Sequence, residues 1–237
     1  MMKPKLILLL ILVALPVAGR AADCVVLLHG LARTSGSMNK LEESLREAGY
    51  EVVNLGYPSR EHPVAELAAQ AVGEGLESCA ATGAGRIDFV THSLGGILVR
   101  YFFAEHSDPR LGRVVMLGPP NQGSELVDAL AEFPGFELLN GPSGDQLGTG
   151  PGSIPEALGP VSFETGVIAG DHSFNPLYTA LIPGPDDGKV SVESTRVEGM
   201  TDHLILPVTH TWMMYNDEVI RQVLQFLANG HFDHRMP

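Results

Sequence analysis

Hydrophobic residues along this chain form two alternating patterns, which are short continuous apolar runs and longer stretches with helical spacing. Continuous apolar runs are typical of strands buried on both faces of a parallel sheet, and apolar residues three or four positions apart are typical of amphipathic helices. These patterns predict strands at residues 25–28, 51–55, 87–90, 113–117 and 163–169, and helices at residues 37–48, 62–79, 94–105, 123–132 and 217–227, the last capped by Asn216. Strands that alternate with helices predict an α/β fold, with a mostly parallel sheet covered by helices on both faces.

One segment, residues 133–160, interrupts this alternation. Its sequence, FPGFELLNGPSGDQLGTGPGSIPEALGP, is rich in Gly and Pro and has little periodicity. Loops of this length in compact domains are usually functional or disordered. Two interpretations therefore remain open, a lid or wall of an acyl-binding site and a surface insertion without a role.

The size and charge of the chain limit the classes of function. Its 237 residues, 44% of them hydrophobic, suffice for one sizeable core, so we expect a single domain over residues 23–237. The formal net charge of −13 argues against binding to nucleic acid, which needs a basic surface. The same charge predicts poor affinity for anionic lipid head groups. The sequence does not determine an oligomeric state.

Residues 1–22 have the layout of a secretory signal peptide. Two lysines precede an apolar run at residues 6–18, and small residues follow it. We predict cleavage between Gly19 and Asp23, which would leave a periplasmic or secreted protein without a membrane span. The alternative is an uncleaved membrane anchor, although the run is shorter than the roughly 20 residues that a spanning helix needs.

Export changes how the two cysteines are interpreted. Cys24 opens the first strand of the mature chain, and Cys79 ends a predicted helix. In an oxidising compartment two cysteines tend to pair, so we predict a disulfide between them. The alternative is a pair of buried free thiols, since unpaired cysteine is also a commonly buried residue.

Ser93 lies where a predicted strand meets a predicted helix, in the sequence RIDFV-THSLGG. A strand, then x-Ser-x-Gly, then a helix is the arrangement of a nucleophile elbow, whose sharp turn lifts the serine oxygen above the sheet. Such a turn needs small residues two positions before and after the serine. Gly95 meets this need, whereas Thr91 departs from the usual glycine. The alternative is a serine that only caps the helix.

The loop after the first strand, in CVVLLHGLART, is expected beside this elbow, because ligands bind at the carboxyl edge of such sheets. Gly30 lets the backbone turn there. The amide of Leu31 can then point to the same place as the amide of Leu94, and we predict that these two amides form an oxyanion hole. We interpret His29 as a structural residue of the loop, because the base of such a site comes near the C-terminus.

The chain order serine, acid, histidine directs the search for the other two groups downstream. His210 follows the apolar stretch LILPV and precedes the last helix, so it is the predicted base, whereas His203 lies at the wrong end of that stretch. Asp187, in PDDGKV, is the predicted acid, which would orient the imidazole and stabilise its protonated form. Asp171 and Asp186 remain alternatives, and Asp-Asp-Gly could also be a simple turn.

These motifs together resemble the small bacterial lipases and esterases of the α/β-hydrolase fold. The strand–HGL loop, the HSLGG elbow, the DDGKV stretch and the VTH before the last helix carry the resemblance, which runs from about Cys24 to Leu227. GPPNQGS, at residues 118–124, is also similar to that family and to enzymes that remove acyl groups from lipid anchors. The resemblance implies a reduced fold with few N-terminal strands, and it favours Asp187 over Asp171 as the acid.

The resemblance also implies a function. Ser93 would be the nucleophile, Asp187 the acid and His210 the base of an exported serine hydrolase that cleaves carboxylic esters of small molecules or lipids through an acyl-enzyme. This chemistry needs no metal or organic cofactor, and no cysteine–histidine cluster has the spacing of a zinc site. Two alternatives remain, another acyl-transfer enzyme (a thioesterase, amidase or transacylase) and a non-catalytic binding protein on a hydrolase scaffold.

Overall fold

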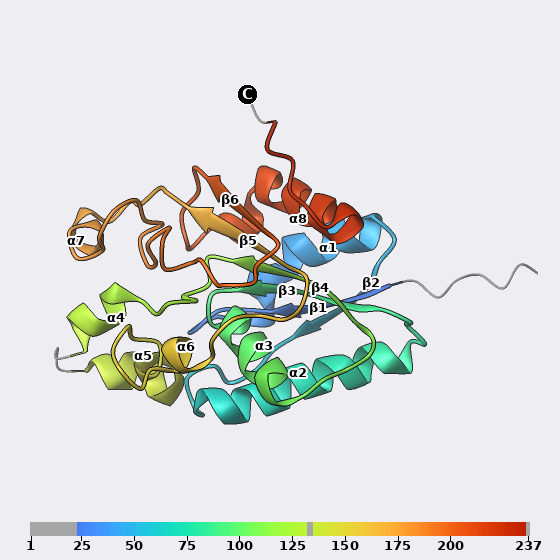
Figure 1. The fold of residues 1–237 in the computed structure, drawn as a ribbon, viewed down its shortest axis with the longest axis horizontal. Helices are drawn as coiled ribbons and strands as arrows, with labels where there is room; N and C mark the ends of the chain where they lie inside the picture. The colour runs from blue at the N-terminus through green and yellow to red at the C-terminus, as the bar shows by residue number, and fades with distance from the viewer. Residues whose placement is uncertain (1–22, 132–134, 236–237) are drawn as a thin grey trace, which may run out of the picture.

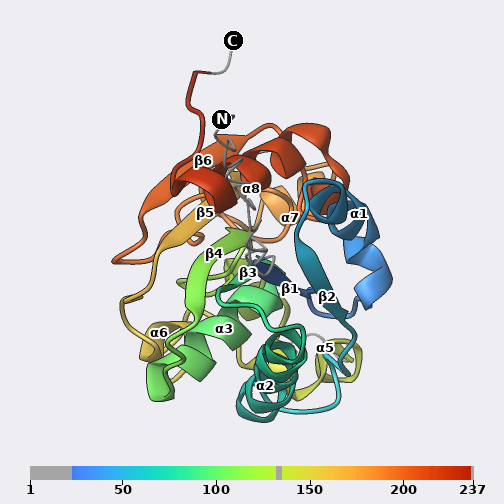
Figure 2. The ribbon, with the colours of Figure 1, turned by 90° about the vertical axis from the view of Figure 1, so that its right-hand side faces the viewer.

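A computed structural model of the chain describes residues 23–131 and 135–235, so the predicted signal peptide lies outside the described residues. The described residues form a six-stranded sheet with the order β2-β1-β3-β4-β5-β6 (Figures 1 and 2). All neighbouring strands are parallel, and they are β1 (Cys24–Leu28), β2 (Glu51–Leu55), β3 (Ile87–His92), β4 (Leu111–Leu117), β5 (Thr165–Gly170) and β6 (Asp202–Leu206). The predicted α/β fold is therefore confirmed.

The order of the strands reverses direction at β1. The chain first moves from β1 to β2 on one side, and then returns to β3 on the other side of β1. In open parallel sheets the loops on the two sides of such a switch point leave a crevice at the carboxyl ends of the strands. The loops after β1 and β3 therefore border the place where a ligand is expected.

Helices cover both faces of the sheet (Figure 2). The side chains of alternate β1 residues point to opposite faces, so Val26 packs in the core beneath α2 and α3 and Val25 packs in the core beneath α1 and α8. The bounds of these helices are α1 (Asn39–Glu47), α2 (Val64–Ala81), α3 (Leu94–Glu105) and α8 (Asp217–Asn229). All five residues of β1 are buried, which explains why its sequence is a continuous apolar run.

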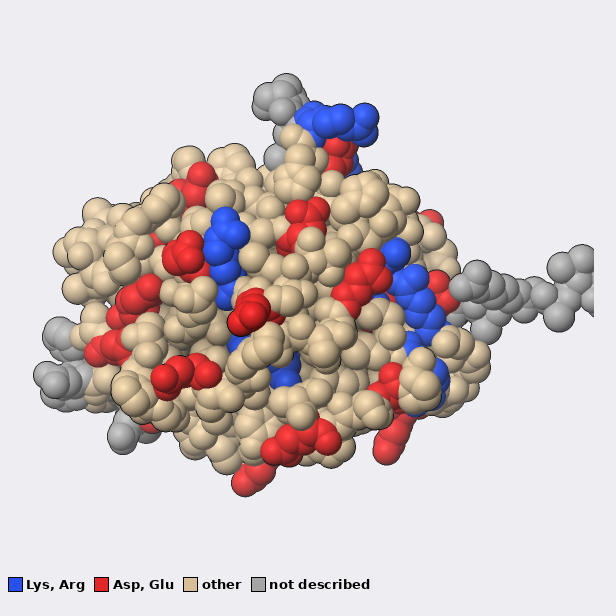
Figure 3. Space-filling model, in the orientation of Figure 1, with Lys and Arg blue, Asp and Glu red and all other residues tan. Residues whose placement is uncertain are grey.

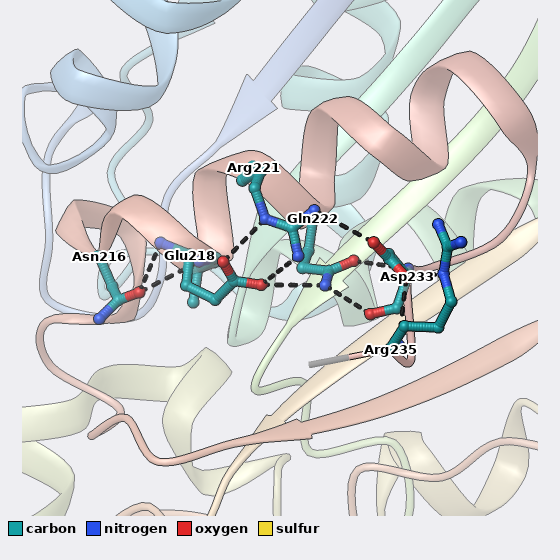
Figure 4. A network of polar contacts seen from close by, with 7 residues as sticks. Asn216, Glu218, Arg221, Gln222, Asp233 and Arg235 are labelled. Atoms are coloured by element: carbon teal, nitrogen blue, oxygen red, sulfur yellow. Dashed lines mark hydrogen bonds and ion pairs between the residues drawn. The ribbon is translucent and has the colours of Figure 1, made fainter. Parts of the chain in front are cut away.

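The last helix, α8, is fixed to the chain that follows it by a polar network (Figure 4). Asn216 caps its first turn by accepting hydrogen bonds from two backbone amides, as its sequence predicts. The buried side chain of Gln222 accepts from the backbone N–H of Asp233 and donates to its carbonyl oxygen, both at 2.9 Å. Glu218 and Arg221 form an ion pair of 2.6 Å on the outer side of the same helix.

The Gly- and Pro-rich segment differs from the irregular loop that its sequence predicts. It contains α5 (Phe136–Asp145), which is kinked at Gly141, and α6 (Ile154–Ala157), whereas residues 133 and 134 lie outside the described residues. Both helical pieces are too short to show a helical period in the sequence. Pro155 lies in the first turn of α6, where the missing N–H of proline has no intrahelical partner to lose.

Figure 1 places α4 (Glu125–Leu130), α5, α6 and α7 (Pro176–Thr179) on the side toward which β5 and β6 point. These short helices therefore lie around the carboxyl edge of the sheet, where the site is expected. Two 3-10 turns, at Ser35–Met38 and Met213–Tyr215, complete the helical elements of the described residues. None of the helices within residues 23–131 and 135–235 is both long and apolar enough to cross a membrane.

The structure has a disulfide between Cys24 and Cys79, as the cysteine pattern predicts. It joins the first residue of β1 to the last turns of α2, and both cysteines are fully buried. The two residues are 55 positions apart in the sequence, and their Cα atoms lie 5.7 Å apart, in the usual range for a disulfide. The bond therefore closes a long loop between a central strand and the helix that covers it.

We predict that the double variant Cys24→Ala, Cys79→Ala unfolds more easily than the native oxidised protein. Removing the cross-link of a loop this long restores chain entropy to the unfolded state, so the free energy of unfolding should fall by about 2–4 kcal/mol. Urea denaturation followed by circular dichroism measures it, with the native protein as reference. Equal urea midpoints would show that the disulfide does not constrain the fold.

Candidate active site

The backbone of Ser93 adopts a conformation that residues with side chains rarely adopt. Its φ of 53° and ψ of −120° lie between the end of β3 and the start of α3, and its N–H donates to Leu117 O at 2.9 Å. Ser93 stands at the N-cap position of α3, but its hydroxyl makes no capping hydrogen bond. The capping interpretation therefore does not explain this serine, and strain of this kind is concentrated at functional sites.

The sharp turn at Ser93 has room because Gly95 and Gly96 follow it within three positions. A Cβ atom on Gly95 would lie 2.6 Å from the carbonyl oxygen of Leu28, closer than any side chain could approach. A Cβ atom on Gly96 would lie 3.3 Å from the hydroxyl of Thr91. The glycine at position 96 thus leaves room for Thr91, the residue that departs from the usual pentapeptide.

His210 and Asp187 form a buried pair behind the elbow. Nδ1–H of His210 donates to Oδ2 of Asp187 at 2.7 Å, and the backbone N–H of His210 donates to the carbonyl oxygen of Asp187 at 2.9 Å. The other carboxylate oxygen accepts the amides of Lys189 at 3.0 Å and Val190 at 2.9 Å. With Nδ1 bound in this way, the imidazole keeps one orientation and its Nε2 is the nitrogen left for chemistry.

The alternatives to this pair lie elsewhere. Asp171 is an exposed residue after β5, and among the described residues its carboxylate makes its one hydrogen bond with the neighbouring His172. Asp186 is buried, but it accepts the amide of Gly188 within its own turn. His203 lies in β6 and hydrogen-bonds to a threonine hydroxyl, and burial lowers its pKa to about 4. The turn interpretation of Asp-Asp-Gly thus describes Asp186, whereas Asp187 is the carboxylate that meets His210.

Gly118, the first residue after β4, provides the space for this pair. A Cβ atom there would lie 3.0 Å from Oδ2 of Asp187 and 3.1 Å from Nδ1 of His210. Its φ of 55° also lies in the left-handed region, which favours glycine. Gly118 was not predicted as a site residue from the sequence, although it is the first residue of the GPPNQGS motif.

The loop after β1 passes directly over the elbow. A Cβ atom on Gly30 would lie 3.1 Å from Cβ of Ser93. In the described part of the chain, neither the amide of Leu31 nor that of Leu94 has a protein acceptor, and Leu94 begins α3, where amides point out of the helix. Both amides that the sequence predicts for an oxyanion hole are therefore available beside Ser93.

Ala32, which follows Leu31, is also strained. Within residues 23–131 and 135–235, Ala32 (φ 55°) and Ser93 (φ 53°) are the two residues other than glycine with positive φ. The amide of Ala32 donates to the hydroxyl of the buried Ser59 at 3.0 Å, which holds this conformation. The strained backbone of the described residues is thus concentrated at one place.

His29 has the structural role that its position predicts. Its ring is buried and stacks on Tyr57 with 4.1 Å between the ring centroids, and the backbone N–H of Tyr57 donates to its Nε2 at 3.3 Å. The phenol of Tyr57 donates in turn to the carbonyl oxygen of His29. Burial lowers the pKa of His29, and the hydrogen bonds and stacking of its ring fix the loop that carries Leu31.

His92, the residue before Ser93, is a site residue that the sequence analysis missed. Its Nε2–H donates to the carbonyl oxygen of His210 at 2.9 Å, and the two imidazole centroids are 4.7 Å apart. Burial holds the pKa of His92 well below its usual range, and the nearby His210 lowers it further. A neutral imidazole therefore supports the predicted base. Its place inside the elbow pentapeptide was the available signal.

A cavity of about 490 Å³ opens above these groups, with Ser93 and His210 in its wall. Apolar side chains of Leu126, Val127, Leu130 and Leu147 form one part of the lining. Arg33 and Lys189 contribute cationic side chains to the same lining. The cavity therefore combines space for a hydrocarbon chain with a charged region.

Known proteins share this architecture. A model of the alpha/beta hydrolase family matches residues 25–232. The structure is similar to the lipase BlEst2 of Bacillus licheniformis in its mature form, with a TM-score of 0.70 at 19% identity over 87% of this chain and 92% of that chain. It is also similar to the phospholipase PlaB of Legionella pneumophila (TM-score 0.59, 20% identity, 80% of this chain, 53% of that chain). A metagenomic carboxyl esterase gives a TM-score of 0.63 at 17% identity over 81% of this chain and 65% of that chain.

We predict that Gly118→Ala separates His210 from Asp187. The added methyl group meets the side chains of Asp187 and His210, and the positive φ of residue 118 is unfavourable for alanine. The free energy of unfolding should therefore also fall by about 1–3 kcal/mol. The proton that Nδ1 of His210 shares with Asp187 should give a strongly deshielded NMR signal, which is assigned by its loss in Asp187→Asn. This signal should also disappear from the spectrum of Gly118→Ala.

The matched control is Gly73→Ala on α2, where a new Cβ atom meets nothing within 4 Å. This variant should keep the deshielded proton and lose no stability, because alanine is the better helix former. A deshielded proton that persists in Gly118→Ala would show that the close approach is not required.

Proposed function

The chain belongs to the alpha/beta hydrolase family, and from that premise we propose that it hydrolyses carboxylic esters through an acyl-enzyme on Ser93. The observation that supports this proposal best is the buried pair of His210 and Asp187 behind a cavity whose wall contains Ser93. A strained serine, an oriented imidazole and two unpaired amides are the parts that acyl transfer needs.

Each step uses groups of this chain. His210 Nε2 takes the proton of Ser93 as its Oγ attacks the ester carbonyl carbon, and Asp187 stabilises the imidazolium that forms. The amides of Leu31 and Leu94 donate to the oxygen of the tetrahedral intermediate. His210 then gives its proton to the departing alcohol. Water enters along the same route, loses a proton to His210 and releases the carboxylic acid from Ser93.

Esters are favoured over the other acyl-transfer substrates by two observations. The compared structures are named as a lipase, a phospholipase and a carboxyl esterase. The apolar part of the cavity, with Leu126, Val127 and Leu130, fits the acyl chain of such substrates. The substrate class in this proposal is therefore a carboxylic ester of a small molecule or lipid.

We further propose that the protein is exported and acts in the periplasm or outside the cell. The charged and apolar layout of residues 1–22 supports a cleaved signal peptide. The disulfide between Cys24 and Cys79 fits an oxidising compartment, because disulfides are rare in the cytosol.

The catalytic proposal is tested with a fluorophosphonate probe and p-nitrophenyl esters from acetate to palmitate. The native protein should be labelled, and Ser93→Ala should not, because the probe phosphonylates an activated serine. Asp187→Asn should lower kcat by about 10³–10⁴-fold, because the imidazole loses its oriented tautomer.

Asp171→Asn is the matched control, since it removes an aspartate that does not contact His210. It should retain native turnover. A native protein that is neither labelled nor active, with and without detergent, would contradict the proposal and favour a binding protein. The chain length with the highest kcat/KM distinguishes an esterase from a lipase.

The export proposal is tested by expressing the full chain in a Gram-negative host. The protein should appear in the periplasmic fraction, and intact mass spectrometry should place its N-terminus between Gly19 and Asp23. The control Leu10→Arg puts a charge into the apolar run and should leave the uncleaved chain in the cytoplasm. A full-length native chain in the membrane fraction would instead support the anchor.

A further inference from the structure

Arg33 and Lys189 stand out among the residues around the cavity. Both side chains line it together with Ser93 and His210. Among the described residues, neither cation has a carboxylate within ion-pair distance. The ring of Tyr178 lies near Lys189, with its centroid 5.2 Å from Nζ.

The other cations of this acidic protein are mostly paired. The face in Figure 3 shows blue side chains beside red ones at several places. Cations in the described residues that lie 2.5 to 2.9 Å from a carboxylate include Lys40, Arg46, Arg86, Arg110, Arg113 and Arg221. The buried guanidinium of Arg100 donates to backbone carbonyl oxygens instead. The chain has 28 acidic residues against 15 basic ones, so two cations of the described residues that share one cavity and form no ion pair call for an explanation.

The two cations are held close to the proposed reaction centre by short stretches of backbone. Arg33 follows Leu31 by two residues, and its N–H donates to Gly30 O within a tight turn. Lys189 follows Asp187 by two residues, and its N–H donates to Oδ1 of Asp187 at 3.0 Å. Each cation thus belongs to a loop that also carries a proposed catalytic group.

The two side chains line the same cavity and carry like charges. Burial lowers the pKa of Lys189, the charge of Arg33 lowers it further, and the charge of Asp187 opposes both effects. Two like charges in a half-buried place cost free energy, which an anion between them would remove. Since the apolar part of the lining suits an acyl chain, the cationic part is left for the alcohol portion of an ester.

We propose that Arg33 and Lys189 form a subsite for a carboxylate or phosphate group on the alcohol portion of the ester substrate. This inference rests on the ester hydrolysis proposed above. It narrows the substrate class to esters with an anionic leaving portion, such as acylated phosphate or carboxylate compounds. The local charge of the cavity thereby decides the specificity, although the net charge of the whole chain predicts poor affinity for anionic head groups.

The test compares two aryl butanoates, 3-(butanoyloxy)benzoate and the neutral 3-(butanoyloxy)benzamide, whose leaving phenols differ only in a carboxylate or an amide at the meta position. The native enzyme should have the higher kcat/KM for the benzoate. Arg33→Gln and Lys189→Gln should each lower the ratio of the two kcat/KM values about three- to tenfold, the size expected for one partly screened charge. The native ratio should also fall as salt rises from about 20 mM to about 500 mM, because salt screens the attraction.

Arg235→Gln is the matched control, because it removes one positive charge from the exposed end of the described chain (Figure 4). Its ratio should equal the native ratio. A native ratio at or below one would overturn the subsite. Equal losses of kcat/KM for both substrates in Arg33→Gln and Lys189→Gln would also overturn it, because the cations would then support the site in general. An equal fall of the ratio in Arg235→Gln would overturn it as well, because it would indicate a long-range electrostatic field.

A binding measurement separates this inference from the proposed function. Calorimetry measures the affinity of Ser93→Ala for octyl phosphate, octyl glucoside and inorganic phosphate. The same measurements are made on a combined variant that also carries Arg33→Gln and Lys189→Gln. The combined variant should bind octyl phosphate at least tenfold more weakly, relative to octyl glucoside, than the protein with both cations does. The protein with both cations should bind inorganic phosphate far more weakly than octyl phosphate. Equal binding of inorganic phosphate would indicate a site for a free anion and overturn the substrate class. Selective binding in a protein without esterase activity would contradict the proposed function alone.

Discussion

The hydrogen bond between His210 and Asp187 is the interaction on which the arrangement of the site depends. A fully buried carboxylate is costly unless its oxygens are satisfied, and here Asp187 accepts N–H groups from the imidazole and from the amides of Lys189 and Val190. These bonds fix the loop before β6 and the loop after it against each other. Because Gly118 leaves the space for both side chains, the end of β4 belongs to the same constraint.

The sheet supplies the place where this constraint acts. Since the strand order reverses at β1, the loops after β1 and β3 border one crevice, and the chain brings His210 to the same edge after β6. β1 and β3 are buried along their whole length, and such strands resist local opening. A rigid base of this kind can hold the unfavourable backbone conformations of Ala32 and Ser93, and these place the amides of Leu31 and Leu94 beside the serine.

Charge in this molecule is organised on two scales. The net charge of −13 describes the surface as a whole, where most cations lie against carboxylates. Around the cavity positive charge prevails, because Arg33 and Lys189 are both cationic and the carboxylate of Asp187 is hydrogen-bonded to His210. An average over the chain therefore says little about what the cavity attracts, since a ligand responds to the charges within a Debye length.

Elements whose signal is local could be predicted from the sequence. β1, β2 and α3 follow from apolar runs and from helical spacing, and Ser93 and His210 were predicted as site residues from their positions relative to a strand and a helix. The short helices within residues 136–157 were missed, because one or two turns carry no periodicity. The sequence favoured Asp187 as the acid but left Asp186 and Asp171 open, and the folded chain shows that Asp187 meets His210. That His92 supports the imidazole and that Arg33 and Lys189 share a cavity was visible only in the tertiary structure. The physical reason is common to all of these. Each depends on a close contact between residues far apart in the sequence, and spacing along a chain does not determine distance in the folded protein.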